Sequence, residues 1–320
     1  MKVVIGPNAF GLHRMCPDLQ KEFPELEFAL CAEPKDLPAA IADTDIYMGW
    51  LNRDVFLAAK KLQWIQSPSS GVNYYLAIPD LVASDVLLTS ASGTHGACVA
   101  ESAMAMILAF TRGIRDAVLR QQQRVWAGRE IRPKLVELTG STMGIVGLGK
   151  IGRSLARRAA AFDMRVIAVD MYPVDKPDCV AELWGLDRLG DLLRESDYVV
   201  VTVPYTPQTH GMIGAKELAL MKPTAMIVPM SRGGIVDQQA MIQALKEKRL
   251  AAAAMDVTDP EPLPPDSELW GMENVLIVPH IAGGSQFEVQ HIKEIFVENL
   301  RRFLRGDLPL RNQVDKKRGF

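Results

Sequence analysis

Three polar residues in the second half of the sequence each follow a short apolar run, and they are Arg232, Glu261 and His280. An arginine fork can hold a carboxylate in bidentate fashion, and a histidine can pass a proton near neutral pH. A nearby carboxylate orients the histidine ring and keeps it protonated to higher pH. Each residue alone is more often a surface cation, a solvated acid or a structural histidine. Three at successive strand ends would meet at one edge of a parallel sheet, so together they predict a site that binds a small anionic substrate and moves a proton.

A glycine-rich turn upstream of these residues points to a dinucleotide. Residues 147–152 read G-L-G-K-I-G, between an apolar run and a helical pattern. Gly147 permits a tight turn, Gly149 lets the backbone approach a pyrophosphate, and Gly152 lets helix and strand pack closely. The N-terminus of the following helix offers N–H groups and partial positive charge to the phosphates. A bare glycine pattern is weak evidence, but a strand before it, a helix after it and an acid about 20 residues on complete the dinucleotide-binding pattern.

That acid is Asp170, at the end of the next apolar run. Its carboxylate can accept hydrogen bonds from an adenosine ribose and would repel a 2′-phosphate. Met171 and Tyr172 follow it, so no arginine comes directly after the acid to bind such a phosphate. We therefore expect NAD rather than NADP as the cofactor.

The elements that must position these residues form two series in which short apolar runs alternate with helical patterns. Candidate strands of the first series lie at residues 3–5, 28–30, 46–48, 64–66 and 87–89, and those of the second at 143–146, 165–169, 198–203, 225–229, 251–256 and 275–278. Helical patterns include 12–22, 55–61, 99–110, 115–126 and 287–305. Such alternation predicts parallel sheets covered by helices. We expect an α/β protein with two Rossmann-like, doubly wound domains and a cleft between them.

The domain boundaries follow from the two series. At 320 residues the chain is long for a single core. We expect residues 1–95, completed by 288–320, to form a substrate-binding domain. Residues 96–287 would form an NAD-binding domain, and we expect no regulatory domain after the last helical stretch.

Composition argues against several classes of protein. The net charge of −2 and the pI of 6.2 give no reason to expect nucleic acid or an acidic membrane as partner. No run approaches the roughly 18 apolar residues of a membrane span, and the N-terminus lacks a signal-peptide pattern. The four cysteines are scattered without C-x-x-C spacing. This favours reduced thiols in a cytoplasmic protein over a disulfide framework or a metal site.

The motifs and their order resemble the NAD-dependent D-2-hydroxyacid dehydrogenase family, which includes D-lactate, D-glycerate, hydroxypyruvate and 3-phosphoglycerate dehydrogenases. Besides the glycine turn with its acid, the matching segments are 203–209 (V-P-Y-T-P-Q-T), 231–237 (S-R-G-G-I-V-D), 255–264 and 279–283 (P-H-I-A-G). The resemblance covers nearly all of the chain.

This resemblance implies catalytic roles for the three polar residues. Arg232 would anchor the substrate carboxylate and polarise its carbonyl, His280 would be the acid/base, and Glu261 would be its pairing carboxylate. The reaction would be hydride transfer between NAD(H) and a small 2-oxo or 2-hydroxy acid, D-specific by resemblance. Reduction is the favoured direction, with glyoxylate, hydroxypyruvate or pyruvate as examples, because Glu261 keeps His280 protonated near neutrality.

Further residues receive binding roles from the same resemblance. Ser70, Gly71 and Val72 resemble the loop whose backbone N–H groups bind the substrate carboxylate, with an ordinary turn as the alternative. The family also implies a homodimer, for which residues 96–139 would supply an interlocking arm. The residues expected at the cofactor are Gly147, Gly149, Lys150, Ile151, Gly152, Asp170, Val203, Pro204, Thr209, Met230, Ser231, Asp256, His280 and Gly283.

Two departures from the family pattern and two rival activities stay open. His95 stands where the family often has Asn, and a structural role is favoured for it over contact with cofactor or substrate. Met230 stands where Asn or Ser is usual. Formate dehydrogenase fits poorly, because it pairs its histidine with Gln where this chain has Glu261. A phosphite dehydrogenase and an NAD(H)-sensing co-repressor remain alternatives, and the substrate side chain is left undetermined.

Overall fold

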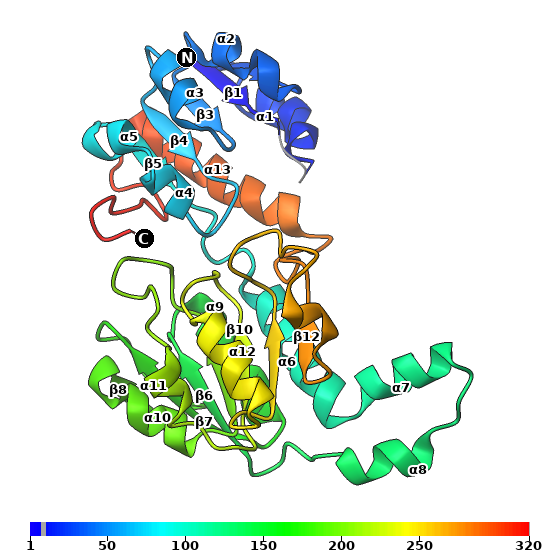
Figure 1. Cartoon of the computed structure of the whole chain (residues 1–320). Helices are drawn as coiled ribbons and strands as arrows, with labels where there is room; N and C mark the ends of the chain where they lie inside the picture. The colour runs from blue at the N-terminus through cyan, green and yellow to red at the C-terminus, as the bar shows by residue number, and fades with distance from the viewer. Residues whose placement is uncertain (8–10, 320) are drawn as a thin grey trace. The chain divides into compact units, whose positions relative to one another are not determined.

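The computed structural model describes residues 1–7 and 11–319. The chain divides into two compact units. Unit 1 consists of Met1–Thr94 and Ser285–Phe320, and unit 2 consists of His95–Gly284. Each unit contains one sheet in which every strand pairing is parallel, with helices packed on it, so the expected α/β class is confirmed (Figure 1).

Unit 1 is built on a five-stranded sheet of order β2-β1-β3-β4-β5. Its strands are β1 (Lys2–Ile5), β2 (Glu27–Leu30), β3 (Ile46–Met48), β4 (Trp64–Gln66) and β5 (Leu87–Thr89). Its helices are η1 (Leu12–Met15), α1 (Cys16–Glu22), η2 (Pro34–Asp36), α2 (Leu37–Ile41), α3 (Arg53–Ala58), α4 (Asn73–Leu76), α5 (Pro79–Ala83) and α13 (Glu288–Arg305). The helical pattern expected over 12–22 is thus a 3-10 turn followed by α1, and Pro17 lies in the first turn of α1, where a missing N–H costs nothing.

The last part of the chain packs on the first sheet. Phe296 of α13 is buried, and its ring centroid lies 5.4 Å from that of Trp64 in β4. Farther on, the Val314 N–H donates to Leu88 O at 2.8 Å, alongside a bridge between Thr89 and Gln313. Burial of these aromatic and aliphatic side chains contributes to the stability of unit 1.

Unit 2 is built on a seven-stranded sheet of order β12-β11-β10-β9-β6-β7-β8. Its strands are β6 (Thr142–Val146), β7 (Arg165–Asp170), β8 (Glu182–Gly185), β9 (Tyr198–Val201), β10 (Met226–Pro229), β11 (Ala252–Met255) and β12 (Val275–Ile277). Its helices are α6 (Gly96–Thr111), α7 (Ile114–Gln122), α8 (Gly128–Ile131), η3 (Arg132–Lys134), α9 (Lys150–Ala161), η4 (Leu186–Arg188), α10 (Leu189–Glu195), α11 (Ala215–Leu218), α12 (Gln238–Lys246) and η5 (Glu268–Gly271). The strand order reverses at β6 and β9, the place where open α/β sheets bind ligands.

Two apolar clusters cover the two faces of the seven-stranded sheet. One contains buried side chains of α6 and α9, such as Ile107 and Leu155. The other contains buried side chains of α10 and α12, such as Leu192 and Leu245. Strands β6, β9, β10 and β11 are buried along their whole length. This continuous burial explains why they read as unbroken apolar runs in the sequence.

Two elements differ from the sequence-based expectation. Edge strand β8 was not expected, because its sequence E-L-W-G is half exposed and lacks an apolar run. The helix expected over 115–126 ends at Gln122, and Arg124 follows with a φ of 59°. No side chain of α7 is fully buried. Burial of an apolar face therefore does not stabilise an extension of this helix toward Trp126.

The segment expected as a dimerisation arm has two parts. Helix α6 belongs to the core of unit 2, whereas α7 and α8 project from the rest of that unit (Figure 1). Within the described ranges, no single helix is long and apolar enough to cross a membrane; α6 and α7, bent by 67°, pass only as a pair and only by length and composition.

Candidate active site

The glycine turn lies between β6 and α9, at the carboxyl edge of the seven-stranded sheet. Gly147 has a φ of 99°, and a Cβ there would lie 2.9 Å from the Val203 nitrogen. A Cβ at Gly152 would lie 2.2 Å from Gly147 O. Both positions therefore require glycine, because neither has space for a Cβ. Gly147 requires it also for its positive φ. Lys150 and Ile151 complete the first turn of α9.

Asp170, the last residue of β7, lies beside this turn. Its Oδ2 accepts a hydrogen bond from the Leu148 N–H at 2.7 Å, and its Oδ1 accepts one from the Tyr172 N–H at 3.0 Å. The carboxylate is thus fixed against the glycine turn by two backbone donors. Each carboxylate oxygen can accept further bonds, so a ribose hydroxyl could still be bound.

Two further observations show that these residues fit a bound dinucleotide. A Cβ at Gly149 would meet nothing within 4 Å, so the main chain there is open to an approaching phosphate. The Ser231 Oγ is buried and has no hydrogen-bond partner among the described residues. A buried hydroxyl without a partner is uncommon and calls for a ligand or water.

His280 and Glu261 form the closest contact between groups able to exchange a proton at this edge. His280 Nδ1 lies 2.8 Å from Glu261 Oε2, and the Thr258 N–H donates to Glu261 Oε1 at 3.1 Å. Burial raises the pKa of Glu261, but the hydrogen bonds from His280 and Thr258 and the charges of His280 and Arg232 outweigh it and leave the pKa below its usual value. Glu261 is therefore a carboxylate throughout the neutral range.

Arg232 follows β10 and belongs to the same group, since its charge acts on Glu261. Its Nη1 donates to Ser231 O at 2.6 Å. The guanidinium has further donors, and its planar fork matches a carboxylate. The structure thus brings Arg232, Glu261 and His280 together from the ends of β10, β11 and β12.

Asp256 holds the backbone that carries His280. Its Oδ1 accepts hydrogen bonds from the Ile281 N–H at 2.9 Å and the Ala282 N–H at 3.1 Å. Burial raises the pKa of Asp256, against the lowering effect of these two bonds. His280 itself has a φ of 51°, a left-handed conformation that is costly for a residue with a side chain. Asp256 stabilises that conformation by bonding the two N–H groups that follow it.

Three residues expected at the cofactor lie in the segment after β9, and they differ in burial and in hydrogen bonding. Val203 is buried against Gly147, and Pro204 is exposed. Thr209 is buried, and its hydroxyl donates to Pro204 O at 2.7 Å and accepts from the Thr206 N–H at 2.8 Å. These bonds give Thr209 a role inside its own loop, and contact with a cofactor stays a prediction for it.

Met230 and Gly283 are two more residues expected at the cofactor, and Gly283 lies against His95. Met230 is buried after β10. The His95 ring packs on Gly283, because a Cβ at that glycine would lie 3.1 Å from His95 Cδ2. His95 is also the N-cap residue of α6, and its carbonyl accepts from the Val99 N–H. His95 thus supports the turn that follows His280.

In unit 1, the expected substrate loop follows β4. The Ser70 hydroxyl donates to Ala91 O at 3.2 Å, and Val72 precedes the short helix α4. Gly71 lies between them and is half exposed. The loop is thus tied to the end of β5, with a glycine at its centre.

Sequence reasoning missed Thr202, Gln238 and Thr258. The Thr202 hydroxyl donates to Gly147 O at 2.7 Å and so fixes the glycine turn. A polar residue directly after an apolar strand was the available signal for Thr202. Gln238 acts through bonds to Asp259, 21 residues away, which no local pattern reveals, whereas Thr258 donates to Glu261 within the same loop. The described residues include no group of three or more His, Cys, Asp and Glu side chains arranged for a metal ion.

Comparison with known proteins gives a consistent result. Residues 104–282 match the family described as D-isomer specific 2-hydroxyacid dehydrogenase, NAD binding domain. The chain belongs to the D-isomer specific 2-hydroxyacid dehydrogenase family. The resemblance inferred from the sequence motifs is therefore confirmed.

Individual relatives of this dehydrogenase carry more specific names. It is 36% identical over 263 residues to a glyoxylate reductase of Korarchaeum cryptofilum, covering 81% of this chain and 78% of that protein. It is 33% identical over 304 residues to a D-3-phosphoglycerate dehydrogenase of Methanocaldococcus jannaschii, covering 93% of this chain but only 57% of that protein. The crystal structure of an NADPH-dependent glyoxylate/hydroxypyruvate reductase from Sinorhizobium meliloti, in complex with NADP and sulfate, matches with a TM-score of 0.86 and 27% identity over 100% of both chains. The dehydrogenase described here is accordingly an oxidoreductase that acts on 2-hydroxy or 2-oxo acids with a nicotinamide cofactor.

Proposed function

We propose that this dehydrogenase reduces small 2-oxo acids of the glyoxylate and hydroxypyruvate class to D-2-hydroxy acids with NADH. The observation that carries the proposal is the 2.8 Å contact between His280 Nδ1 and Glu261 Oε2, with the charge of Arg232 acting on the same carboxylate. A proton donor and a carboxylate-binding cation are the two protein groups that such a reduction needs. The names of the glyoxylate reductase relatives support the substrate class.

His280 is the proposed proton donor, and the geometry selects its reactive atom. Its Nδ1 is engaged by Glu261, so Nε2 is the nitrogen that gives its proton to the substrate carbonyl oxygen. When NADH is bound, it supplies a hydride to C2 of the 2-oxo acid. Glu261 stabilises the protonated imidazole before this transfer and keeps the ring oriented.

Arg232 is proposed to bind the substrate carboxylate and polarise the adjacent carbonyl. Negative charge grows on the carbonyl oxygen as reduction proceeds, so a fixed cation stabilises the transition state more than the ground state. In unit 1, we assign Ser70, Gly71 and Val72 to binding of the substrate carboxylate through backbone N–H groups. A glycine at the centre of that loop favours close approach of the main chain.

The preference for NADH over NADPH is proposed from Asp170. Its carboxylate is held at the end of β7 by two backbone donors and would repel a 2′-phosphate. The Sinorhizobium meliloti relative is described as NADPH-dependent, so cofactor choice varies among similar proteins and must be measured for this one.

We also propose that unit 1 binds the substrate, that unit 2 binds the cofactor, and that the enzyme is a cytoplasmic homodimer. The four free thiols fit a reducing compartment. Helices α7 and α8 would form the dimer arm, since the side chains of Val118 and Leu119 are 48% and 45% exposed and Trp126 is fully exposed. Apolar side chains gathered on one projecting segment are typical of a surface that another chain covers.

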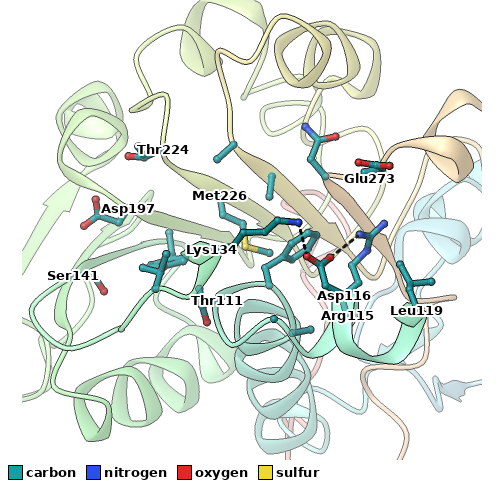
Figure 2. Close-up of a pocket in the computed structure, with 18 of the residues that line it drawn as sticks. Thr111, Arg115, Asp116, Leu119, Lys134, Ser141, Asp197, Thr224, Met226 and Glu273 are labelled. Atoms are coloured by element: carbon teal, nitrogen blue, oxygen red, sulfur yellow. Dashed lines mark hydrogen bonds and ion pairs between the residues drawn. The ribbon is translucent and has the colours of Figure 1, made fainter. Parts of the chain in front are cut away.

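A groove beside this arm supports the homodimer. Figure 2 shows it between α7 and the sheet of unit 2, with Leu119 and Met226 among its lining residues and Asp116 paired with Lys134 at 3.0 Å. Its volume is about 1000 Å³. A second copy of the chain would bury the apolar part of this groove and the exposed side chains of the arm.

A substrate panel tests the proposed function directly. Purified protein is mixed with NADH or NADPH and with glyoxylate, hydroxypyruvate, pyruvate or phenylpyruvate, and absorbance of the reduced cofactor is followed. We expect the largest kcat/KM with NADH and either glyoxylate or hydroxypyruvate. Oxidation of phosphite with NAD, tested in parallel, would favour the phosphite dehydrogenase alternative. NADH binding without turnover of any substrate would favour the co-repressor alternative.

A further inference from the structure

Arg232 and Glu261 lie in different loops, and strand pairing alone does not fix their separation. The ladder between β10 and β11 pairs Met226 with Ala252 and Ile227 with Ala253. One further backbone bond runs from the Asp256 N–H to Pro229 O at 3.2 Å. Both functional residues come after the last of these bonds, so other contacts must hold their loops together.

Gln238 makes one such contact with both ends of its side-chain amide. Its Nε2 donates to Asp259 O at 2.7 Å, and its Oε1 accepts from the Asp259 N–H at 3.0 Å. Gln238 is the first residue of α12, which follows the Arg232 segment, and Asp259 lies two residues before Glu261. The amide thus imitates a strand partner and satisfies both backbone groups of Asp259.

Gly233 brings the same two segments into direct contact. A Cβ at Gly233 would lie 1.9 Å from Thr258 O, a distance that no side chain can tolerate. The backbone N–H of Thr258 donates a hydrogen bond to Glu261 Oε1. The loop 258–261 is therefore in contact with Gly233 and bonded to Gln238, which are both part of the segment that starts at Arg232.

We propose that Gln238 is a positioning residue for the Glu261–His280 pair. By binding both backbone groups of Asp259, it fixes loop 258–261 against the Arg232 segment and holds the Glu261 carboxylate at His280 Nδ1. This inference rests on the proposed function, in which Glu261 acts through His280. Gln238 itself touches neither substrate nor cofactor in this role.

Substitution of the amide tests the proposal. Gln238→Met keeps the length of the side chain and removes both hydrogen bonds, whereas Gln238→Glu keeps the acceptor and loses the donor. Gln239→Met is the matched control, because it makes the same change at the next, exposed position of α12. We expect Gln238→Met to lower kcat about tenfold, since small misplacements of catalytic groups are costly, with unchanged NADH binding. We expect Gln239→Met to leave kcat unchanged.

Two readouts separate positioning from a merely structural role. In Gln238→Met, the alkaline limb of the plot of kcat/KM against pH should move to lower pH. The same substitution should cause no shift of this limb in a protein that already carries Glu261→Gln. Amide hydrogen exchange at Thr258 and Asp259 should accelerate in Gln238→Met and not in Gln239→Met. If Gln238→Met fails to fold, Gln238→Glu serves in the same measurements and should show both effects.

The outcomes distinguish this inference from the proposed function. An unshifted alkaline limb, or equal shifts with and without Glu261, would overturn the role of Gln238 while leaving the reductase activity intact. A wild-type protein that reduces no 2-oxo acid would refute the proposed function. Amide exchange then still decides whether Gln238 fixes loop 258–261, because that measurement needs no substrate.

Discussion

The two edges of the seven-stranded sheet differ in the chemistry of the side chains that they present. At the amino edge, a groove of about 1000 Å³ lies beside the arm. At the carboxyl edge lie the glycine turn, Asp170 and the Arg232–Glu261–His280 group. The lining residues of the groove include no histidine or cysteine, and three of its acids form ion pairs: Asp116 with Lys134, Glu130 with Arg120, and Asp197 with Lys222. The groove therefore lacks histidine, the side chain whose unperturbed pKa lies nearest to neutral pH.

This difference teaches that the chemistry of a site identifies it better than its size. A large pocket is the usual starting hypothesis for an active site, and the groove at the amino edge is large enough to qualify by volume alone. In a parallel sheet, every loop that follows a strand emerges at the carboxyl edge, so residues distant in sequence collect there. The amino edge receives only the loops that enter strands, and in unit 2 it is the arm that makes it concave.

The sharpest test of the comparison is His280→Ala at the carboxyl edge. Removing the proposed proton donor should lower kcat by about 10²–10⁴, with little change in NADH affinity, because the cofactor contacts of the glycine turn remain. Steady-state kinetics and NADH fluorescence titration measure the two effects. His13→Ala, which removes an exposed histidine of unit 1, should leave both unchanged. Near-normal turnover in His280→Ala would mean that another group donates the proton.

The matching test of the amino-edge arm is Trp126→Ala. Loss of a fully exposed aromatic side chain from the arm should raise the dimer dissociation constant about 30-fold, which corresponds to a hot spot of about 2 kcal/mol. Sedimentation velocity over a range of concentrations measures this constant, and His280→Ala should not alter it. A wild-type protein that sediments as a 35.3 kDa monomer at all concentrations would contradict the proposed dimer.

A smaller effect is expected for Asp170→Ala. Loss of the carboxylate removes hydrogen bonds to the ribose and the repulsion of a 2′-phosphate, so the NADH-to-NADPH ratio of kcat/KM should fall about tenfold. Asp178→Ala, at an exposed position nearby, is the matched control. An unchanged ratio in Asp170→Ala would show that another group selects the cofactor.

The smallest effect is expected for Glu261→Gln, and it concerns pH. Because the pKa of Glu261 lies below its usual value, the residue is a carboxylate in the neutral range, and its negative charge favours a positive charge on its partner, His280. Neutral replacement of Glu261 should move the alkaline limb of kcat/KM for reduction to lower pH by about one unit. Glu268→Gln, at an exposed glutamate, should leave the limb in place. A shift of the alkaline limb to higher pH in Glu261→Gln would contradict the proposed role of Glu261.

Local patterns sufficed to predict much of the fold and part of the site. The buried strands of the two sheets were expected because continuous apolar runs between turn residues are typical of parallel sheets. The glycine turn was expected because its geometry is set within six residues. Edge strand β8 was missed because a half-exposed strand has no such run.

Contacts between distant segments could not be predicted in this way. The bonds from Asp256 to the backbone after His280, and the left-handed conformation of His280 that they stabilise, join the ends of β11 and β12. The amide bonds of Gln238 to Asp259 join α12 to the loop after β11. Neither Asp256 nor Gln238 carries a sequence signal for its partner, because the partner is a backbone group about 20 or more residues away.

By itself, the sequence determined which chemistry is present in this protein: a dinucleotide turn, an acid for the ribose, and an arginine, a glutamate and a histidine at strand ends. Residue type and local spacing decide these features. The tertiary structure alone decided how those groups are held, through Thr202, Asp256 and Gln238, and where the large groove lies. Hydrogen bonds between loops depend on the distances at which folding places their ends, and those distances are a property of the packed sheet rather than of any local segment.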